Sequence, residues 1–159
     1  MGKDVDRAYV ADRLRALCSR REYCSSDILK KAVTMLDGNM DEARIVLEKL
    51  VDEKYVDDYR YSCAYARDKA SIAGWGEVKI RYMLRAKGVA SDVIDAAIEE
   101  IDDTKADMRL MKLMLNKFKS LRDDPQSRMK LVRYAVGRGY PYDEVISVAD
   151  QIIKSYEGI

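Results

Sequence analysis

The chain has 159 residues, of which 48% are apolar and 36% are charged, and its formal net charge is +1. This length allows one domain or a short array of smaller units, and the balanced charge excludes a chain that binds nucleic acid through its overall positive charge. No apolar run is long enough to span a membrane and the N-terminus lacks the apolar segment of a secretory signal, so we expect a soluble protein of the cytoplasm.

The side chains that carry most catalytic and metal-binding chemistry are scarce. Histidine, the commonest metal ligand and general base near neutral pH, is absent. Cys18, Cys24 and Cys63 have no Cys-x-x-Cys spacing, which argues against a disulfide framework. No glycine-rich phosphate loop follows a predicted strand. We therefore expect no enzymatic activity, no cofactor and no metal.

The first predicted unit covers residues 1–53 and contains three helices. Ser25 or Ser26 can cap the second helix, because a hydroxyl oxygen can accept a hydrogen bond from a free N–H group of the first turn. Asn39, followed three residues later by Glu42, has the spacing of a capping box at the start of the third helix. The helices are expected at 9–21, 26–36 and 40–53.

The second predicted unit covers residues 54–102. Asp58 favours a helix start, and Gly74 and Gly76 allow the backbone to reverse around Trp75. The helices are expected at 58–72, 77–87 and 91–101. The predicted buried face of the first of them carries Tyr61, Ala64, Tyr65 and Ile72.

The third predicted unit covers residues 103–159. Asp124 and Pro125 read as an N-cap followed by proline at the first helical position, and Gly139 ends the helix that begins there. Pro141 stands near the start of the last helix. The helices are expected at 104–121, 125–138 and 141–156. The predicted buried face of the first carries Met108, Met111, Met114, Leu115, Phe118 and Leu121.

Three glycines mark a repeat. Gly38, Gly88 and Gly139 each stand between two helical segments, at separations of 50 and 51 residues. No segment shows the sustained apolar–polar alternation of a strand. The sequence therefore predicts an all-α fold in which three tandem three-helix repeats form an elongated, curved array.

Positive charge is gathered locally, with 10 basic against 3 acidic residues in the window 105–138. In the predicted helix 104–121 four cations fall on one stripe about 80° wide, and an acid-free run separates Glu77 from Asp92 in the second unit. Such faces either contact a partner or are ordinary solvated surfaces. The candidate partner-binding or DNA-binding residues are Arg60, Arg67, Lys69, Lys79, Arg81, Arg85, Lys87, Lys105, Arg109, Lys112, Lys119, Arg133 and Arg138.

The aromatic residues are mostly tyrosines, 11 against one phenylalanine and one tryptophan. Tyrosine rings can stack on single-stranded bases, but Tyr61, Tyr65, Tyr82 and Tyr134 lie on or near predicted buried faces, which favours packing. Trp75, between two glycines, is interpreted as a plug between helices rather than a base reader.

The second unit resembles the central repeat of the RecX family, regulators that bind and restrain the bacterial recombinase RecA. The motifs that carry the resemblance are, in order, Asp57-Asp58, Arg60-Tyr61, Arg67-Asp68-Lys69, Gly74-Trp75-Gly76 and Lys87-Gly88-Val89. The likeness extends more loosely over about residues 8–155, with Arg138-Gly139-Tyr140 where the family has Arg-Gly-aromatic. The chain departs from the family pattern at Ser62-Cys63, Gly137 and Pro141.

The resemblance implies a modulator, chiefly an inhibitor, of RecA that acts in DNA repair, recombination and the SOS response. Such a protein lies in the groove of the RecA filament on single-stranded DNA, limits filament growth and lowers ATP hydrolysis, strand exchange and co-protease activity. The basic faces can contact DNA phosphate or acidic RecA surfaces, and the sequence is compatible with both partners. Two other functions fit the residues alone: a helix-turn-helix protein that reads duplex DNA, and a helical-repeat scaffold.

Overall fold

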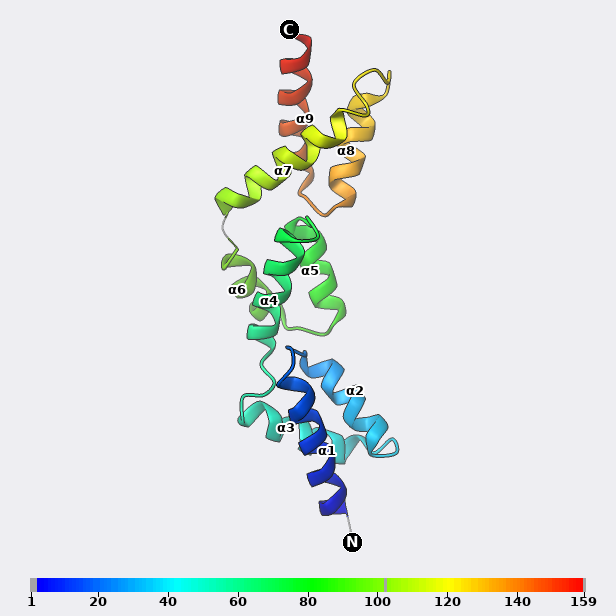
Figure 1. Cartoon of the computed structure of the whole chain (residues 1–159), viewed down its shortest axis with the longest axis vertical. Helices are drawn as coiled ribbons and strands as arrows, with labels where there is room; N and C mark the ends of the chain where they lie inside the picture. The colour runs from blue at the N-terminus through cyan, green and yellow to red at the C-terminus, as the bar shows by residue number, and fades with distance from the viewer. Residues whose placement is uncertain (1–2, 102, 159) are drawn as a thin grey trace. The chain divides into compact units, whose positions relative to one another are not determined.

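The computed structural model describes residues 3–101 and 103–158. Within these ranges the chain forms nine α-helices and no β-strand, as Figure 1 shows. The predicted all-α helical repeat fold is therefore confirmed. The helices are α1 (Lys3–Cys18), α2 (Ser25–Met35), α3 (Met40–Asp52), α4 (Asp58–Ser71), α5 (Glu77–Ala86), α6 (Ser91–Glu99), α7 (Asp103–Phe118), α8 (Ser127–Gly137) and α9 (Tyr142–Glu157).

The chain divides into two compact units whose boundaries fall inside α4, α5 and α6. Unit 1 comprises Met1–Tyr65 and Leu84–Ala97, and unit 2 comprises Ala66–Met83 and Ile98–Ile159. Each unit thus contains one outer group of three helices together with a part of the central group. The finer division into repeats at 1–53, 54–102 and 103–159 stays a prediction.

The core of unit 1 lies between α1, α2 and α3. Val10 and Leu14 on α1, and Val46 and Leu50 on α3, are buried pairs four residues apart, so each pair lies on one helix face. Ile28 of α2 completes this core and is fully buried. Burial of each such side chain contributes about 1.5–3 kcal/mol, which explains why these short helices hold together.

The core of unit 2 lies where α7, α8 and α9 pack together (Figure 1). The predicted buried face of α7 was partly wrong, because Met108 and Leu115 are 67% and 45% exposed. Met114, Phe118 and Leu121 are buried as predicted, and Leu110 is buried with them, so the buried face is rotated around the helix axis toward Leu110. The partners on the other two helices are Leu131, Ala135, Val145, Ala149 and Ile152.

Two further predictions of burial were wrong in the central helices. Ile72, at the end of α4, is 82% exposed, and Tyr82 on α5 is 67% exposed. On α4 the chain buries Tyr61 and the small residues Ala66 and Ala70.

The glycine repeat is borne out by the backbone. Gly38, Gly88 and Gly139 follow α2, α5 and α8, and their φ angles are 88°, 81° and 98°. This is the left-handed region that glycine enters without a steric penalty and in which helices commonly end. The regular spacing in sequence therefore marks three equivalent helix stops.

Several helix starts differ from their predictions. Neither Ser25 nor Ser26 caps α2 through its side chain; the N-cap is Cys24, which makes no side-chain cap hydrogen bond. Helix α8 begins at Ser127, because Asp124 accepts a hydrogen bond from the Gln126 N–H at 2.8 Å and closes a turn before the helix. Helix α1 begins at Lys3, six residues before its predicted start.

At α3 the predicted cap is confirmed, since Asn39 Oδ1 accepts a hydrogen bond from the Glu42 N–H at 3.2 Å.

In unit 1 the start of α2 is capped from a distant part of the chain. The Ser25 N–H donates to Asp58 Oδ1 at 2.7 Å, and the Ser26 hydroxyl donates to the Lys87 carbonyl oxygen at 2.5 Å. The first turn of α2 thus meets the start of α4 and the end of α5. These bonds satisfy a free N–H group of α2 and a carbonyl at the end of α5.

In unit 2 the start of α5 is capped by backbone carbonyls that follow α8. The Gly76 N–H donates to the Arg138 oxygen at 2.9 Å, and the Val78 N–H donates to the Gly139 oxygen at 2.8 Å. A Cβ atom at Gly76 would lie 2.5 Å from the Gly139 oxygen, and one at Gly139 would lie 2.2 Å from Lys79 Cβ. This close backbone approach requires glycine on both sides.

Gly139→Ala is expected to lower the free energy of unfolding more than Gly38→Ala. Both changes place a side chain in the left-handed region, at a cost of about 1–2 kcal/mol. Only at Gly139 does the added Cβ also collide with a neighbour, since nothing lies within 4 Å of the corresponding atom at Gly38. Urea unfolding followed by far-UV circular dichroism measures both losses, and equal losses would contradict this account of the junction.

Candidate partner and nucleic-acid interface

Three of the predicted binding residues form ion pairs within the chain. Arg60 pairs with Glu22, Lys87 pairs with Asp27 at 3.0 Å, and Arg81 pairs with Glu77 at 2.9 Å one helical turn away. The hydrogen bond to Glu22 raises the pKa of Arg60, and the hydrogen bond to Asp27 raises the pKa of Lys87. A partner must compete with these carboxylates for the three cations.

Other predicted residues are exposed cations on separate helices. In the described part of the chain they form no ion pair with an acid. They are Arg67 on α4, Arg85 on α5, Lys105, Lys112 and Lys119 on α7, and Arg133 on α8. These side chains can reach a partner without breaking an internal contact.

Lys69 and Lys79 converge on Trp75, in the connection between α4 and α5. Their Nζ atoms lie 4.7 and 4.4 Å from the centroid of the tryptophan ring. Each cation–π contact of this kind contributes about 0.5–1 kcal/mol. The turn is fixed by its backbone, because Gly74 has a φ of 71° and the Trp75 N–H donates to the Lys69 oxygen at 2.9 Å.

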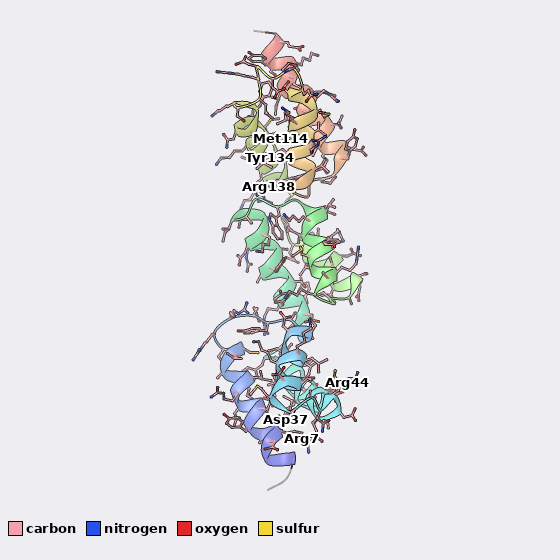
Figure 2. All side chains as sticks on the ribbon, turned by 90° about the vertical axis from the view of Figure 1, so that its right-hand side faces the viewer. Arg7, Asp37, Arg44, Met114, Tyr134 and Arg138 are labelled. Atoms are coloured by element: carbon pink, nitrogen blue, oxygen red, sulfur yellow. The ribbon has the colours of Figure 1, made fainter. Side chains whose placement is uncertain are left out.

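A second aromatic residue with two cations lies next to this turn. Arg138 donates from Nη1 to the Ala73 oxygen and from Nη2 to the Tyr134 hydroxyl, both at 3.3 Å. Lys117 Nζ, from α7, lies 4.9 Å from the centroid of the Tyr134 ring. Figure 2 shows Tyr134 and Arg138 close together beside the α4–α5 connection.

We call this group the Trp75 cluster; it consists of Lys69, Trp75, Lys79, Lys117, Tyr134 and Arg138. It brings together three of the residues predicted from sequence, Lys69, Lys79 and Arg138. Sequence reasoning did not select the other three as binding residues. The spacing of Lys69, Trp75 and Lys79 around a glycine turn is a sequence signal that could have identified Trp75. The contact of Lys117 with Tyr134 depends on how α7 packs on α8, so no local sequence pattern indicates it.

A pocket of about 370 Å³ adjoins the cluster, since Trp75 forms part of its wall. Arg109 and Tyr140 line the same pocket, together with three carboxylates. The Tyr140 hydroxyl donates to the Gly74 oxygen at 3.2 Å, and burial raises the pKa of Tyr140. Arg109 is half-buried here, so it is separated from the exposed lysines that share its predicted stripe. The carboxylates are Glu77, Asp107 and Glu144.

The exposed lysines of α7 border an apolar groove. Met108, Leu115 and Tyr156 line this groove, whose volume is about 710 Å³, and Lys112 and Lys119 stand beside them. The basic stripe of α7 is therefore next to exposed apolar side chains and not opposite a fully buried face.

Among residues 3–101 and 103–158, no group of three or more histidine, cysteine or acidic residues is placed to hold a metal ion. In the same residues, every helix is too short or too polar to cross a bilayer. Cys18, Cys24 and Cys63 are free thiols, and Cys24 is buried.

Comparison with known proteins places this geometry in a family context. Residues 57–98 match the sequence model described as RecX, second three-helix domain. The chain is 32% identical over 136 residues to the regulatory protein RecX of Chromohalobacter salexigens, covering 84% of this chain and 86% of that one. It is 27% identical to the RecX protein of Prosthecochloris aestuarii, covering 94% and 97%. The match spans only about half, 52%, of the longer Clostridium tetani relative.

Solved structures show the same fold. A crystal structure of regulatory protein RecX superposes with a TM-score of 0.81 at 25% identity, covering 96% of this chain and 73% of that one. The structure of RecX from Lactobacillus salivarius gives a TM-score of 0.81 at 17% identity, covering 95% and 98%.

Lys87→Gln is expected to remove an acid-sensitive contribution to stability. Burial opposes ionisation of Asp27, but hydrogen bonds from Lys87 and Cys24 lower its pKa on balance. Because the folded-state pKa lies below the unfolded one, the stabilisation is present above about pH 3.9 and is lost as the pH falls through the folded value. The wild-type chain should be more stable than the variant by up to about 1 kcal/mol at neutral pH.

The measurement is urea unfolding of both chains at several pH values from neutral to about pH 3, and the difference between the two free energies should shrink as the pH falls. Lys119→Gln, which removes an exposed lysine with no acidic partner in the described residues, is the control and should not change the pH dependence. A constant difference between wild type and Lys87→Gln at every pH would refute the pairing.

Proposed function

This chain belongs to the RecX family, and from that premise we propose that it regulates RecA by binding the filament that RecA forms on single-stranded DNA. The observation that carries the proposal is the match over most of both chains to relatives named as regulatory proteins. The all-α helical repeat fold, which is shared with a solved structure of regulatory protein RecX, agrees with it.

The proposed action is inhibitory. A protein bound along the filament blocks addition of RecA subunits, favours disassembly and so lowers ATP hydrolysis, strand exchange and co-protease activity. We propose that this chain contributes binding alone, in the cytoplasm, with no catalysis and no cofactor of its own. RecA supplies the nucleotide chemistry.

Two kinds of surface support the proposed contact. The exposed cations Arg67, Arg85 and Arg133 can meet phosphate or acidic protein groups directly. The Trp75 cluster combines cations with aromatic rings, a combination that suits single strands, whose bases present open faces. We propose that the filament is contacted through these residues, while Arg60, Arg81 and Lys87 chiefly serve the fold.

The direct test is hydrolysis of ATP by RecA on single-stranded DNA, with and without this protein. We expect the rate to fall at amounts comparable to RecA, and we expect no ATP hydrolysis by this protein alone. Unchanged RecA activity in the presence of a large excess of this protein would refute the proposal. Strong binding to one duplex sequence in the absence of RecA would point instead to a groove-reading DNA-binding protein.

Arg85 and Arg81 provide a matched pair of variants on one helix. Arg85→Gln should weaken inhibition of RecA and lower the salt dependence of binding by about one phosphate contact, or about 0.7 in the log–log slope for a single strand. Arg81→Gln should have a smaller effect, because its guanidinium is paired with Glu77. ATP hydrolysis by RecA, measured over a range of salt concentrations, compares the two variants. A larger effect of Arg81→Gln than of Arg85→Gln would contradict this assignment of roles.

A further inference from the structure

We propose that the Trp75 cluster is a binding site for single-stranded nucleic acid, in which an unpaired base stacks on Trp75 and the adjoining phosphates lie against Lys69 and Lys79. This deepens the proposed function and rests on it for the setting of the RecA filament. The site itself follows from the geometry of unit 2 and can be tested with DNA alone.

The first argument is the convergence of positive charge. The ammonium groups of Lys69 and Lys79 lie within 5 Å of the same ring centroid. An anion that approaches this turn is attracted by both ammonium groups at once. Within residues 3–101 and 103–158, no ion pair to an acid joins Lys79, Lys117 or Arg138. Lys79, Lys117 and Arg138 can therefore meet a phosphate without first breaking an ion pair to an acid.

The second argument is the aromatic surface. Trp75 is half-buried in a turn and is not among the buried core residues. A base that stacks on this ring displaces a lysine ammonium group from the ring toward the adjoining phosphate. Such stacking tolerates any sequence, because every base has a π-face. Tyr134, with Lys117 and Arg138, repeats the same combination of one ring and two cations on the neighbouring helix. The cluster therefore offers two ring surfaces and four positive charges.

The third argument is the pocket beside Trp75. Its carboxylates, Glu77, Asp107 and Glu144, repel phosphate, so the backbone of a bound strand belongs on the lysine side of the site. Asp107 can accept a hydrogen bond from an N–H group of a base, such as N3–H of thymine, whereas Glu77 is already paired with Arg81. A volume of about 370 Å³ lies within the range of pockets that hold small organic groups. The site thus separates a face for phosphate from a face for a base.

The fourth argument is that the cluster is held in place before any ligand arrives. The backbone bonds from Gly76 and Val78 to the carbonyls of Arg138 and Gly139 fix the Trp75 turn against the end of α8. Arg138 adds its own bond to the Ala73 oxygen. A ligand therefore does not have to order the turn, which lowers the entropic cost of binding.

The experiment uses the fact that Trp75 is the one tryptophan in the sequence, so the intrinsic tryptophan emission of the whole protein reports on this site. Oligo(dT) is titrated into the protein at low salt, without RecA. We expect quenching that saturates, because a stacked base perturbs the excited indole. A duplex of the same length should leave the emission unchanged, because its bases are already paired and stacked.

Two variants separate the charges from the ring, with affinity measured by the anisotropy of a labelled oligo(dT). Lys69→Gln with Lys79→Gln should weaken binding by about tenfold or more at low salt and reduce the salt slope by about 1.4, the value for two lost phosphate contacts. Trp75→Phe should keep the salt slope but lower the affinity, by a factor between a few-fold and about 100-fold, as expected for loss of the indole stacking surface.

The matched control is Lys30→Gln with Lys49→Gln, which removes the same charge from exposed positions on α2 and α3, outside the cluster. Four outcomes would each overturn the proposal. Two concern affinity: the Lys69/Lys79 variant binds as tightly as wild type, or both double variants are weakened equally. Two concern fluorescence: oligo(dT) leaves the tryptophan emission unchanged, or the duplex quenches it as strongly as oligo(dT) does. The RecA assay is independent of all four outcomes. If the protein inhibits RecA but oligo(dT) does not change the emission of Trp75, the proposed function stands and the Trp75 binding site is refuted.

Discussion

The close approach of two backbones at Gly76 and Gly139 is the constraint on which unit 2 depends. It joins the carbonyls that follow α8 to the free N–H groups at the start of α5, so two helix ends satisfy each other without side-chain caps. The partial charges of the two ends are opposite, so their meeting is also electrostatically favourable. The Trp75 turn and Arg138 are positioned by this junction, and the candidate site is therefore a product of the same contacts that assemble the fold.

Features that depend on a few consecutive residues could be predicted from the sequence. The three glycine stops and the Asn39 cap were of this kind, because a positive φ or an N-cap is a local requirement. Burial was predicted less well. Met108 and Ile72 fit an apolar face by period, but the period does not reveal which part of the face a neighbouring helix covers. The start of α2 likewise could not be read locally, since its cap comes from Asp58.

The same difference between local features and features set by tertiary packing applies to the candidate site. Sequence reasoning selected Lys69, Lys79 and Arg138 because basic residues were dense or matched a family motif, and the structure places them in one cluster. It could not distinguish them from Arg60, whose partner Glu22 lies 38 residues away in the chain. Whether a cation faces a carboxylate or an aromatic ring is decided by tertiary packing, and a charge count carries no information on that choice.

The three helix stops differ in how tightly they are packed, and this difference bears on how the sequence can drift during evolution. Gly38 needs only a residue that tolerates a positive φ, a demand that asparagine also meets at modest cost. Gly139 needs the conformation and, in addition, the absence of any side-chain atom, since Lys79 occupies the space where one would stand. Mutational freedom is therefore unequal between positions that look identical by their spacing. The stop at Gly38 can diverge, while the contact between Gly139 and α5 admits almost no alternative residue.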